Sequence, residues 1–181
     1  MTLQDPDGDL VRRIGEGDAH AVEALVARKL PRMTALAYRL LGDRGEAEDV
    51  VQEVFVRVWR GAATWRPGAA KFDTWMHRVA LNLCTDRLRK RRESALPQDW
   101  DAPDPTPNAE ATLTARAESD AVERALASLA PRQREALVLT YYQELSNQEA
   151  AALMGIGVDA LESLLARGRR ALKLRLEQGH D

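Results

Sequence analysis

The sequence predicts an all-α protein in which two small helical domains are joined by a flexible linker. Ala and Leu supply 29 and 24 of the 181 residues and Ile only two, a composition that favours helices because Ala and Leu lose little rotamer freedom there. An acidic stretch, Ser94 to Asn108, holds four of the eight prolines, and proline disfavours helix. We therefore expect a first domain at residues 8–92, a linker at 93–116 and a second domain at 117–178.

Four helices are expected in the first domain. Aspartates precede the first three, where a carboxylate can accept hydrogen bonds from the free N–H groups of the first turn. Pro31 should bend the second helix and Gly42 should end it. The expected helices run from Asp7 or Asp9 to Ile14, from Asp18 to Leu41, from Asp43 to Arg60 and from Phe72 to Arg92.

The third and fourth helices each carry an apolar stripe at three- and four-residue steps. Valine is common in the third and would also suit a strand, but the 3.6-residue period and the length favour a helix. The stripes consist of Val50, Val51, Val54, Phe55 and Val58 in the third helix, and of Phe72, Trp75, Met76, Val79 and Leu83 in the fourth.

Four further helices are expected in the second domain. Pro131 can begin the second of them, because a first-turn residue needs no N–H. Ser146 to Glu149 forms a capping box, in which each side chain accepts from the other residue's backbone N–H. The helices are expected from Ser119 to Leu129, from Pro131 to about Gln143, from Ser146 to Met154 and, after the turn Gly155–Gly157, from Val158 to about Leu176.

The last two helices and their glycine turn have the form of a helix-turn-helix, whose second helix can enter the DNA major groove. Small side chains permit close approach to a groove, and arginines pair with phosphates or guanine edges. An ordinary antiparallel helix pair with a basic solvent face is the alternative. On a helical wheel, Leu161, Leu164, Leu165, Gly168 and Leu172 face inward, Asp159, Ala160, Ser163, Ala166, Arg167 and Arg170 face outward, and Arg169 and Lys173 flank the outward face.

A second group of residues surrounds the start of the fourth helix. Trp65, Phe72 and Trp75 lie within eleven residues, and five bases without an acid end that helix between Arg87 and Arg92. Aromatic rings beside cations suit melted nucleic acid, because bases stack on the rings while cations hold the backbone. Phe72 and Trp75 could equally be core residues. Asn82 lies off the apolar stripe and could reach a base edge.

The third helix carries an acidic face, formed by Glu46, Glu48, Asp49, Gln52 and Glu53. Paired carboxylates could serve catalysis, but no histidine lies nearby and no nucleophile motif, phosphate loop or metal-ligand cluster occurs. We therefore expect a solvated or protein-binding face, no enzymatic activity, no metal and no cofactor. The single cysteine, Cys84, is expected to be a small buried hydrophobe rather than a redox sensor.

The net charge of −2 would by itself argue against a nucleic-acid binder, since phosphate contacts dominate affinity. However, the charge is divided into blocks: Asp43–Glu53 holds five acids and one base, Glu93–Asp120 seven acids and one base, and Arg167–Arg175 five bases and no acid.

The longest uncharged run is nine residues, which is too short to span a membrane. The acidic N-terminus is unlike a secretory signal. We expect a cytoplasmic protein.

Three motifs in this order resemble the extracytoplasmic-function group of bacterial sigma factors. Asp49–Trp59 (DVVQEVFVRVW) resembles regions 2.1–2.2, which dock on the clamp helices of RNA polymerase. Phe72–Asn82 (FDTWMHRVALN) with Asp86–Arg92 (DRLRKRR) resembles regions 2.3–2.4, which melt and read the minus-10 element. Leu129–Glu135 (LAPRQRE), continuing into the helix-turn-helix, resembles region 4, which reads the minus-35 element.

The resemblance implies a role for each candidate residue. It implies that Asn82 recognises a flipped minus-10 base in a pocket shaped by the loop from Trp65 to Lys71. The residues implied to contact the polymerase are Asp49, Gln52, Glu53 and Arg57. Those implied to contact the minus-10 element are Trp65, Lys71, Asn82, Arg87, Arg89, Lys90 and Arg91. Those implied to contact the minus-35 element are Ser163, Arg167 and Arg170. The implied partners are core RNA polymerase (clamp helices and flap), promoter DNA and an anti-sigma factor, without membrane insertion.

Two positions early in the recognition helix depart from the family pattern. The family often has Lys and Arg at these positions, where this chain has Glu162 and Leu164. Glu162 would repel the DNA backbone, and Leu164 would pack inward.

Two other functions compete with that of a sigma factor. A stand-alone helix-turn-helix repressor or activator would not need the acidic face, and an adaptor binding only protein would tolerate Asn82→Ala. A polymerase subunit need not be basic overall, so we expect the free chain to bind duplex DNA poorly.

Overall fold

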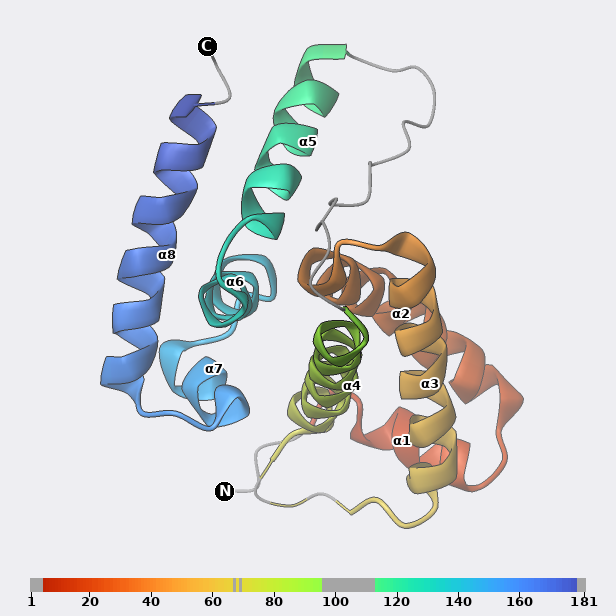
Figure 1. Cartoon of the computed structure of the whole chain (residues 1–181). Helices are drawn as coiled ribbons and strands as arrows, with labels where there is room; N and C mark the ends of the chain where they lie inside the picture. The colour runs from red at the N-terminus through yellow and green to blue at the C-terminus, as the bar shows by residue number, and fades with distance from the viewer. Residues whose placement is uncertain (1–4, 67, 69, 96–112, 179–181) are drawn as a thin grey trace.

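The computed structural model describes residues 5–66, 68, 70–95 and 113–178, and within these ranges it contains helices and no strand (Figure 1). The expected all-α class is thereby confirmed for the described part of the chain. The helices are α1 (Gly8–Gly15), α2 (Ala19–Leu41), α3 (Arg44–Ala62), α4 (Phe72–Ser94), α5 (Leu113–Ala127), α6 (Pro131–Leu137), the π-helix η1 (Val138–Tyr142), α7 (Asn147–Met154) and α8 (Val158–Gln178).

The first domain is built by α1 to α4 around the long helix α2. The Asp18 carboxylate accepts from the N–H groups of His20 and Ala21, and Gly42 ends α2 in a left-handed conformation with φ of 69°, as expected. Pro31 lies inside α2, which continues past it as one helix. The whole expected stripe of α3 is buried, with exposures of 4% or less for Val50, Val51, Val54, Phe55 and Val58.

The expected stripe of α4 is only partly right. Phe72 and Met76 are buried, but Trp75 is only half-buried, like Val79 and Leu83. The fully buried face of α4 continues through His77, Ala80, Leu81 and Cys84 instead. The physical reason is that α4 contacts α2 and α3 of its own domain and also α7 of the second domain, so two sides of this helix are covered.

Local signals set the ends of the helices in the second domain. The expected capping box is present: the Glu149 N–H donates to Ser146 Oγ at 3.2 Å, and the Ser146 N–H donates to Glu149 Oε2 at 2.9 Å. Gly155 ends α7 with φ of 65°. Helices α6 and α8 approach closely at Gly168, where a Cβ would lie 3.0 Å from Leu137 Cδ1, so a larger residue would require the Leu137 side chain to shift.

Three local expectations about caps and helix ends are not met. Asp7 precedes α1 without capping it by its side chain, because its carboxylate pairs with Arg28 and Lys29. Helix α5 begins at Leu113, inside the range expected to be linker, while 96–112 of that range lie outside the described residues. The helix expected up to about Gln143 is α6 followed by η1, with the Gln143 N–H bonded to Val138 O at 3.0 Å.

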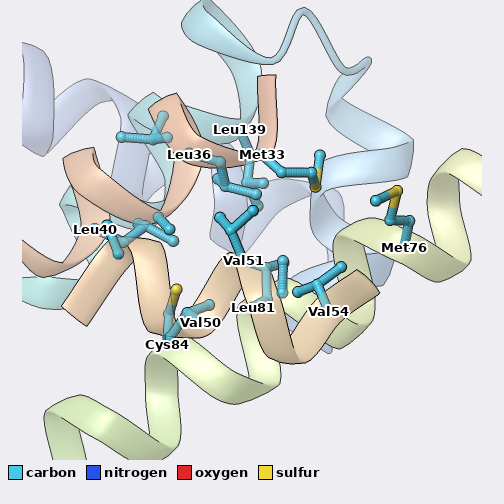
Figure 2. Close-up of a cluster of buried hydrophobic side chains, with 14 of the residues drawn as sticks. Met33, Leu36, Leu40, Val50, Val51, Val54, Met76, Leu81, Cys84 and Leu139 are labelled. Atoms are coloured by element: carbon cyan, nitrogen blue, oxygen red, sulfur yellow. The ribbon is translucent and has the colours of Figure 1, made fainter. Parts of the chain in front are cut away.

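The two domains contact each other through α2 and α4 on one side and α5, α6, η1 and α7 on the other (Figure 1). Leu139 of η1 is fully buried, and it belongs to one cluster with Met33 and Leu36 of α2 (Figure 2). The apolar core of the first domain therefore continues into the second.

Candidate nucleic-acid interface

The helix-turn-helix is formed by α7, the glycine turn and α8. Leu161 and Leu165 are 0% and 4% exposed, and Gly168 is buried against α6. Leu164 and Leu172 are half-buried against the core. The opposite face is exposed and carries all the residues expected there, namely Asp159, Ala160, Ser163, Ala166, Arg167 and Arg170.

Two contacts shape the exposed face of α8. Ser163 Oγ donates to Asp159 O at 3.0 Å, and Arg167 Nε donates to Ser163 O at 3.2 Å, so both side chains lie along the helix surface. Glu162 is also exposed, and it accepts from Asn147 Nδ2 at 3.5 Å. Its carboxylate therefore faces the start of α7, while Leu164 turns toward the core.

Three aromatic rings gather at the start of α4. Trp65 meets Phe72 edge-on, with ring centroids 5.7 Å apart, and Phe72 meets Trp75 at 5.6 Å. Phe72 is 1% exposed, so it is a core residue. Trp65 and Trp75 remain half-buried, whereas Lys71 and Asn82 are exposed. Trp65 and Trp75 are thus both packed on the buried Phe72, and these three rings are called the aromatic wall below.

The basic residues that end α4 are not equivalent. Arg91 turns inward, donating to Leu41 O at 2.8 Å and pairing with Glu46, so it ties α4 to the start of α3. Arg89 pairs with Asp86 at 3.1 Å, and Arg87 lies 3.9 Å from Asp49. Lys90 and Arg92 are exposed. The outward positive charge of this helix is therefore smaller than the sequence alone suggests.

The acidic face of α3 lies at the surface. Asp49, Gln52 and Arg57 are exposed, and Glu53 is half-buried and accepts from Arg57 Nε at 3.1 Å. Trp59, one turn further along, is 44% exposed. Trp59 is not among the residues that the sequence predicts to contact the polymerase, although tryptophan is enriched at protein interfaces.

A polar cluster between the two domains was not foreseen. Gln143, 1% exposed, accepts from Arg32 Nε at 3.0 Å and is bonded to His77 Nε2 at 3.0 Å. His77 is fully buried, and its Nδ1 is bonded to Asp73 O at 2.8 Å. Gln143 lies 66 residues from His77 and 111 from Arg32 along the sequence, so no local pattern could reveal its contacts with them.

Further polar contacts join the domains beside this cluster. Arg39 of α2 pairs with Glu123 of α5 at 3.1 Å and lies 4.0 Å from the ring centre of Tyr142. Burial raises the pKa of the Glu123 carboxyl despite the nearby Arg39. Arg134 of α6 donates to Leu40 O at 2.9 Å. The interface thus combines an apolar centre with arginines from both domains.

Within the described residues, no group of three or more His, Cys, Asp or Glu side chains is placed to hold a metal ion. None of the described helices is both long enough and apolar enough to cross a membrane.

We expect Cys84 to be unreactive in the folded protein. It is 1% exposed, and burial raises the pKa of its thiol to about 12, so almost no thiolate forms at neutral pH. Labelling with a disulfide reagent at pH 8 should be slow in buffer and fast in denaturant. Rapid stoichiometric labelling of the native chain would contradict this expectation.

Comparisons with known proteins extend over both domains. The family model of sigma-70 region 2 matches residues 25–94 and that of sigma-70 region 4 matches residues 119–172. The ECF RNA polymerase sigma factor SigE of Mycolicibacterium smegmatis is 38% identical over 157 residues, which cover 83% of this chain and 60% of that protein. SigW of Bacillus subtilis, also an ECF RNA polymerase sigma factor, is 28% identical over 92% of this chain and 94% of that protein.

Among solved structures, CnrH in complex with the cytosolic domain of CnrY has a similar fold. The TM-score is 0.72 at 29% identity, and the match covers 96% of this chain and 99% of that chain. Both domains, their order and the helix-turn-helix therefore agree with one family. This chain belongs to the extracytoplasmic-function group of the sigma-70 family.

Proposed function

We propose that this chain is an alternative sigma factor, which binds core RNA polymerase in the bacterial cytoplasm and directs promoter-specific initiation of transcription. The observation that carries the proposal is the presence of three surfaces on one chain of this family: the acidic face of α3, the aromatic wall of α4 and the exposed face of α8. The family is one of transcription regulators rather than of enzymes.

In the proposed complex, α3 binds the clamp helices of the polymerase and the second domain binds its flap. Asp49, Gln52 and Arg57 support this role because they are exposed on one helix, and Glu53 holds Arg57 in place. A repressor that acts alone would have no use for such a face. We therefore favour a polymerase subunit over a stand-alone DNA-binding regulator.

The proposed promoter contacts divide between the domains. Asn82 would read a minus-10 base flipped out of the duplex, at an unstacking cost of a few kcal/mol, with Trp65 and Lys71 shaping the pocket. The cations at the end of α4 would hold the DNA backbone, with Lys90 the most available of them. Ser163, Arg167 and Arg170 on α8 would contact the minus-35 element.

Run-off transcription with purified core polymerase tests the proposed function. We expect core polymerase to give defined transcripts from genomic DNA of the host bacterium only when this chain is added. Tight binding of the free chain to duplex DNA without any promoter-dependent transcript would instead favour a repressor or activator. Unchanged transcription with Asn82→Ala would contradict the assigned minus-10 contact.

Arg167→Ala separates base reading from phosphate contact. If Arg167 reads a base, we expect a loss of about 1–3 kcal/mol at one promoter position and relaxed preference there. If it holds a phosphate, binding should weaken equally on all sequences and the salt dependence should fall. Competition binding of the holoenzyme to single-substituted promoters measures both. Arg12→Ala, on the far helix α1, is the control, and equal effects of the two variants would overturn the assignment.

We also propose that an anti-sigma factor regulates this chain. This proposal is supported by the similar protein CnrH, whose structure was solved in complex with the cytosolic domain of CnrY. Affinity purification of the tagged chain from its host, followed by transcription assays, tests this point. A partner that copurifies and abolishes transcription is the expected result.

A further inference from the structure

The N-terminal segment Asp5–Ile14, called the strap below, lies before the part of the chain that the region 2 model matches, which begins at residue 25. It is nevertheless firmly packed. Val11 is 0% and Ile14 is 8% exposed, and α1 contacts both α2 and α3. At Gly15, a Cβ would lie 3.0 Å from the backbone of Ala62. The strap is therefore an integral part of the first domain.

Asp5 supplies a cap that α4 otherwise lacks. Lys71, the residue before α4, makes no side-chain cap, so the first N–H groups of this long helix need an outside acceptor. The Phe72 N–H donates to Asp5 Oδ2 at 2.6 Å, across 67 positions of sequence. The other oxygen, Oδ1, accepts from the Asp7 N–H at 3.0 Å. One carboxylate thus fixes both the strap and the first residue of α4.

A second tie reaches the same turn of α4. The buried Asp7 carboxylate pairs with Lys29 Nζ at 2.6 Å, and Lys29 Nζ pairs in turn with Asp73 at 2.7 Å. Asp7 and Lys29 are 3% and 7% exposed. Burial alone would raise the pKa of the Asp73 carboxyl, but Lys29, His77 and Arg32 lower it overall. The strap, α2 and α4 are therefore joined by the charged side chains of Asp7, Lys29 and Asp73.

The turn held in this way carries the aromatic wall. Phe72 is its central ring, contacting Trp65 from the loop and Trp75 from the next turn of α4. Asn82 and the basic end lie further along the same helix. Because a helix is stiff, fixing its first turn fixes the position of every later residue relative to the loop.

We propose that Asp5 is a positioning residue for promoter opening: by capping α4 it sets the loop-to-helix geometry of the pocket that captures the flipped minus-10 base. This inference rests on the proposed function. In this proposal Asp5 does not contact DNA itself. A charge-assisted hydrogen bond to a backbone N–H is among the stronger kinds, so its removal should loosen the pocket while the core of the domain remains folded.

The test compares Asp5→Ala, Asp5→Asn and the matched control Asp9→Ala, each assembled with core polymerase. Asp9 lies in the same segment, but its exposed carboxylate pairs with Arg12 rather than with α4. The probe is a promoter duplex recovered by run-off transcription, with 2-aminopurine in the minus-10 element, whose fluorescence rises as the base unstacks. Affinity for core polymerase and the melting temperature are measured in parallel.

We expect Asp5→Ala to reduce opening about tenfold, the size of one charge-assisted hydrogen bond, with core affinity unchanged. Asp5→Asn keeps an acceptor oxygen and should restore most of the opening, and Asp9→Ala should match the unmodified chain. Opening by Asp5→Ala equal to that of the unmodified chain would overturn the inference. So would a parallel loss of opening and core affinity, which indicates a purely structural role. If the unmodified chain itself opens no promoter, the proposed function fails instead.

Discussion

Lys29→Met should destabilise the first domain by about 3–5 kcal/mol, because removing one partner of a buried ion pair leaves uncompensated charge. Lys29 Nζ lies between the carboxylates of Asp7 and Asp73, at 2.6 and 2.7 Å. Methionine keeps most of the apolar volume of the lysine side chain, so the loss in free energy of unfolding measures the contribution of the ammonium charge. Denaturant unfolding at pH 7, followed by circular dichroism, measures the free energy of unfolding.

The pH dependence of this loss has a definite sign. Since the pKa of Asp73 is lowered in the folded chain, folding releases a proton from this group near its ordinary pKa of about 3.9. Its stabilisation is complete above that pH and disappears as the pH falls through the lowered value. The difference between Lys29→Met and the unmodified chain should therefore be full at pH 7 and shrink below about pH 4.

Arg28→Ala is the matched control for Lys29→Met. Arg28 also pairs with Asp7, at 2.9 Å, but its side chain is 52% exposed. Water screens such a pair, so we expect a loss below about 1 kcal/mol. Equal losses for the two variants, or a loss for Lys29→Met that does not change between pH 7 and pH 3, would contradict the assigned role of the buried ammonium.

The sequence predicts those parts of the fold that local chemistry decides. The cap at Asp18, the left-handed Gly42, the capping box from Ser146 and the buried stripe of α3 all follow from neighbouring residues, and all are confirmed. The exposed and buried faces of α8 also agree with the helical wheel. A period of 3.6 residues assigns the faces correctly where a helix is covered on one side.

Contacts between segments that are distant in the chain could not be predicted from the sequence. Burial of Cys84 was expected, but the stripe expected on α4 missed His77, Ala80 and Leu81, because that helix is covered from two directions. Arg91 looked like a DNA contact, yet it is bonded to Leu41 O, 50 residues away. Asp7 looked like a helix cap, yet it binds Lys29. For Arg91 and Asp7, a polar partner distant in sequence outweighs the local preference.

The domain interface leads to the second prediction, which concerns Gln143. Replacing it by alanine should cost about 1–3 kcal/mol because the buried His77 loses its partner, and less for Arg32, whose side chain is 38% exposed and can be solvated. The π-helix η1 ends directly before Gln143, which caps it, and π-helical turns often mark functional positions. Gln143→Ala should therefore weaken the contact between the domains more than either domain itself.

Small-angle scattering of the free chain measures this weakening. A compact chain of 181 residues should have a radius of gyration near about 16 Å, and we expect a larger value for Gln143→Ala. Gln148→Ala, an exposed glutamine on α7, is the matched control and should leave the radius unchanged. An unchanged radius for Gln143→Ala would show that Gln143 does not hold the domains together.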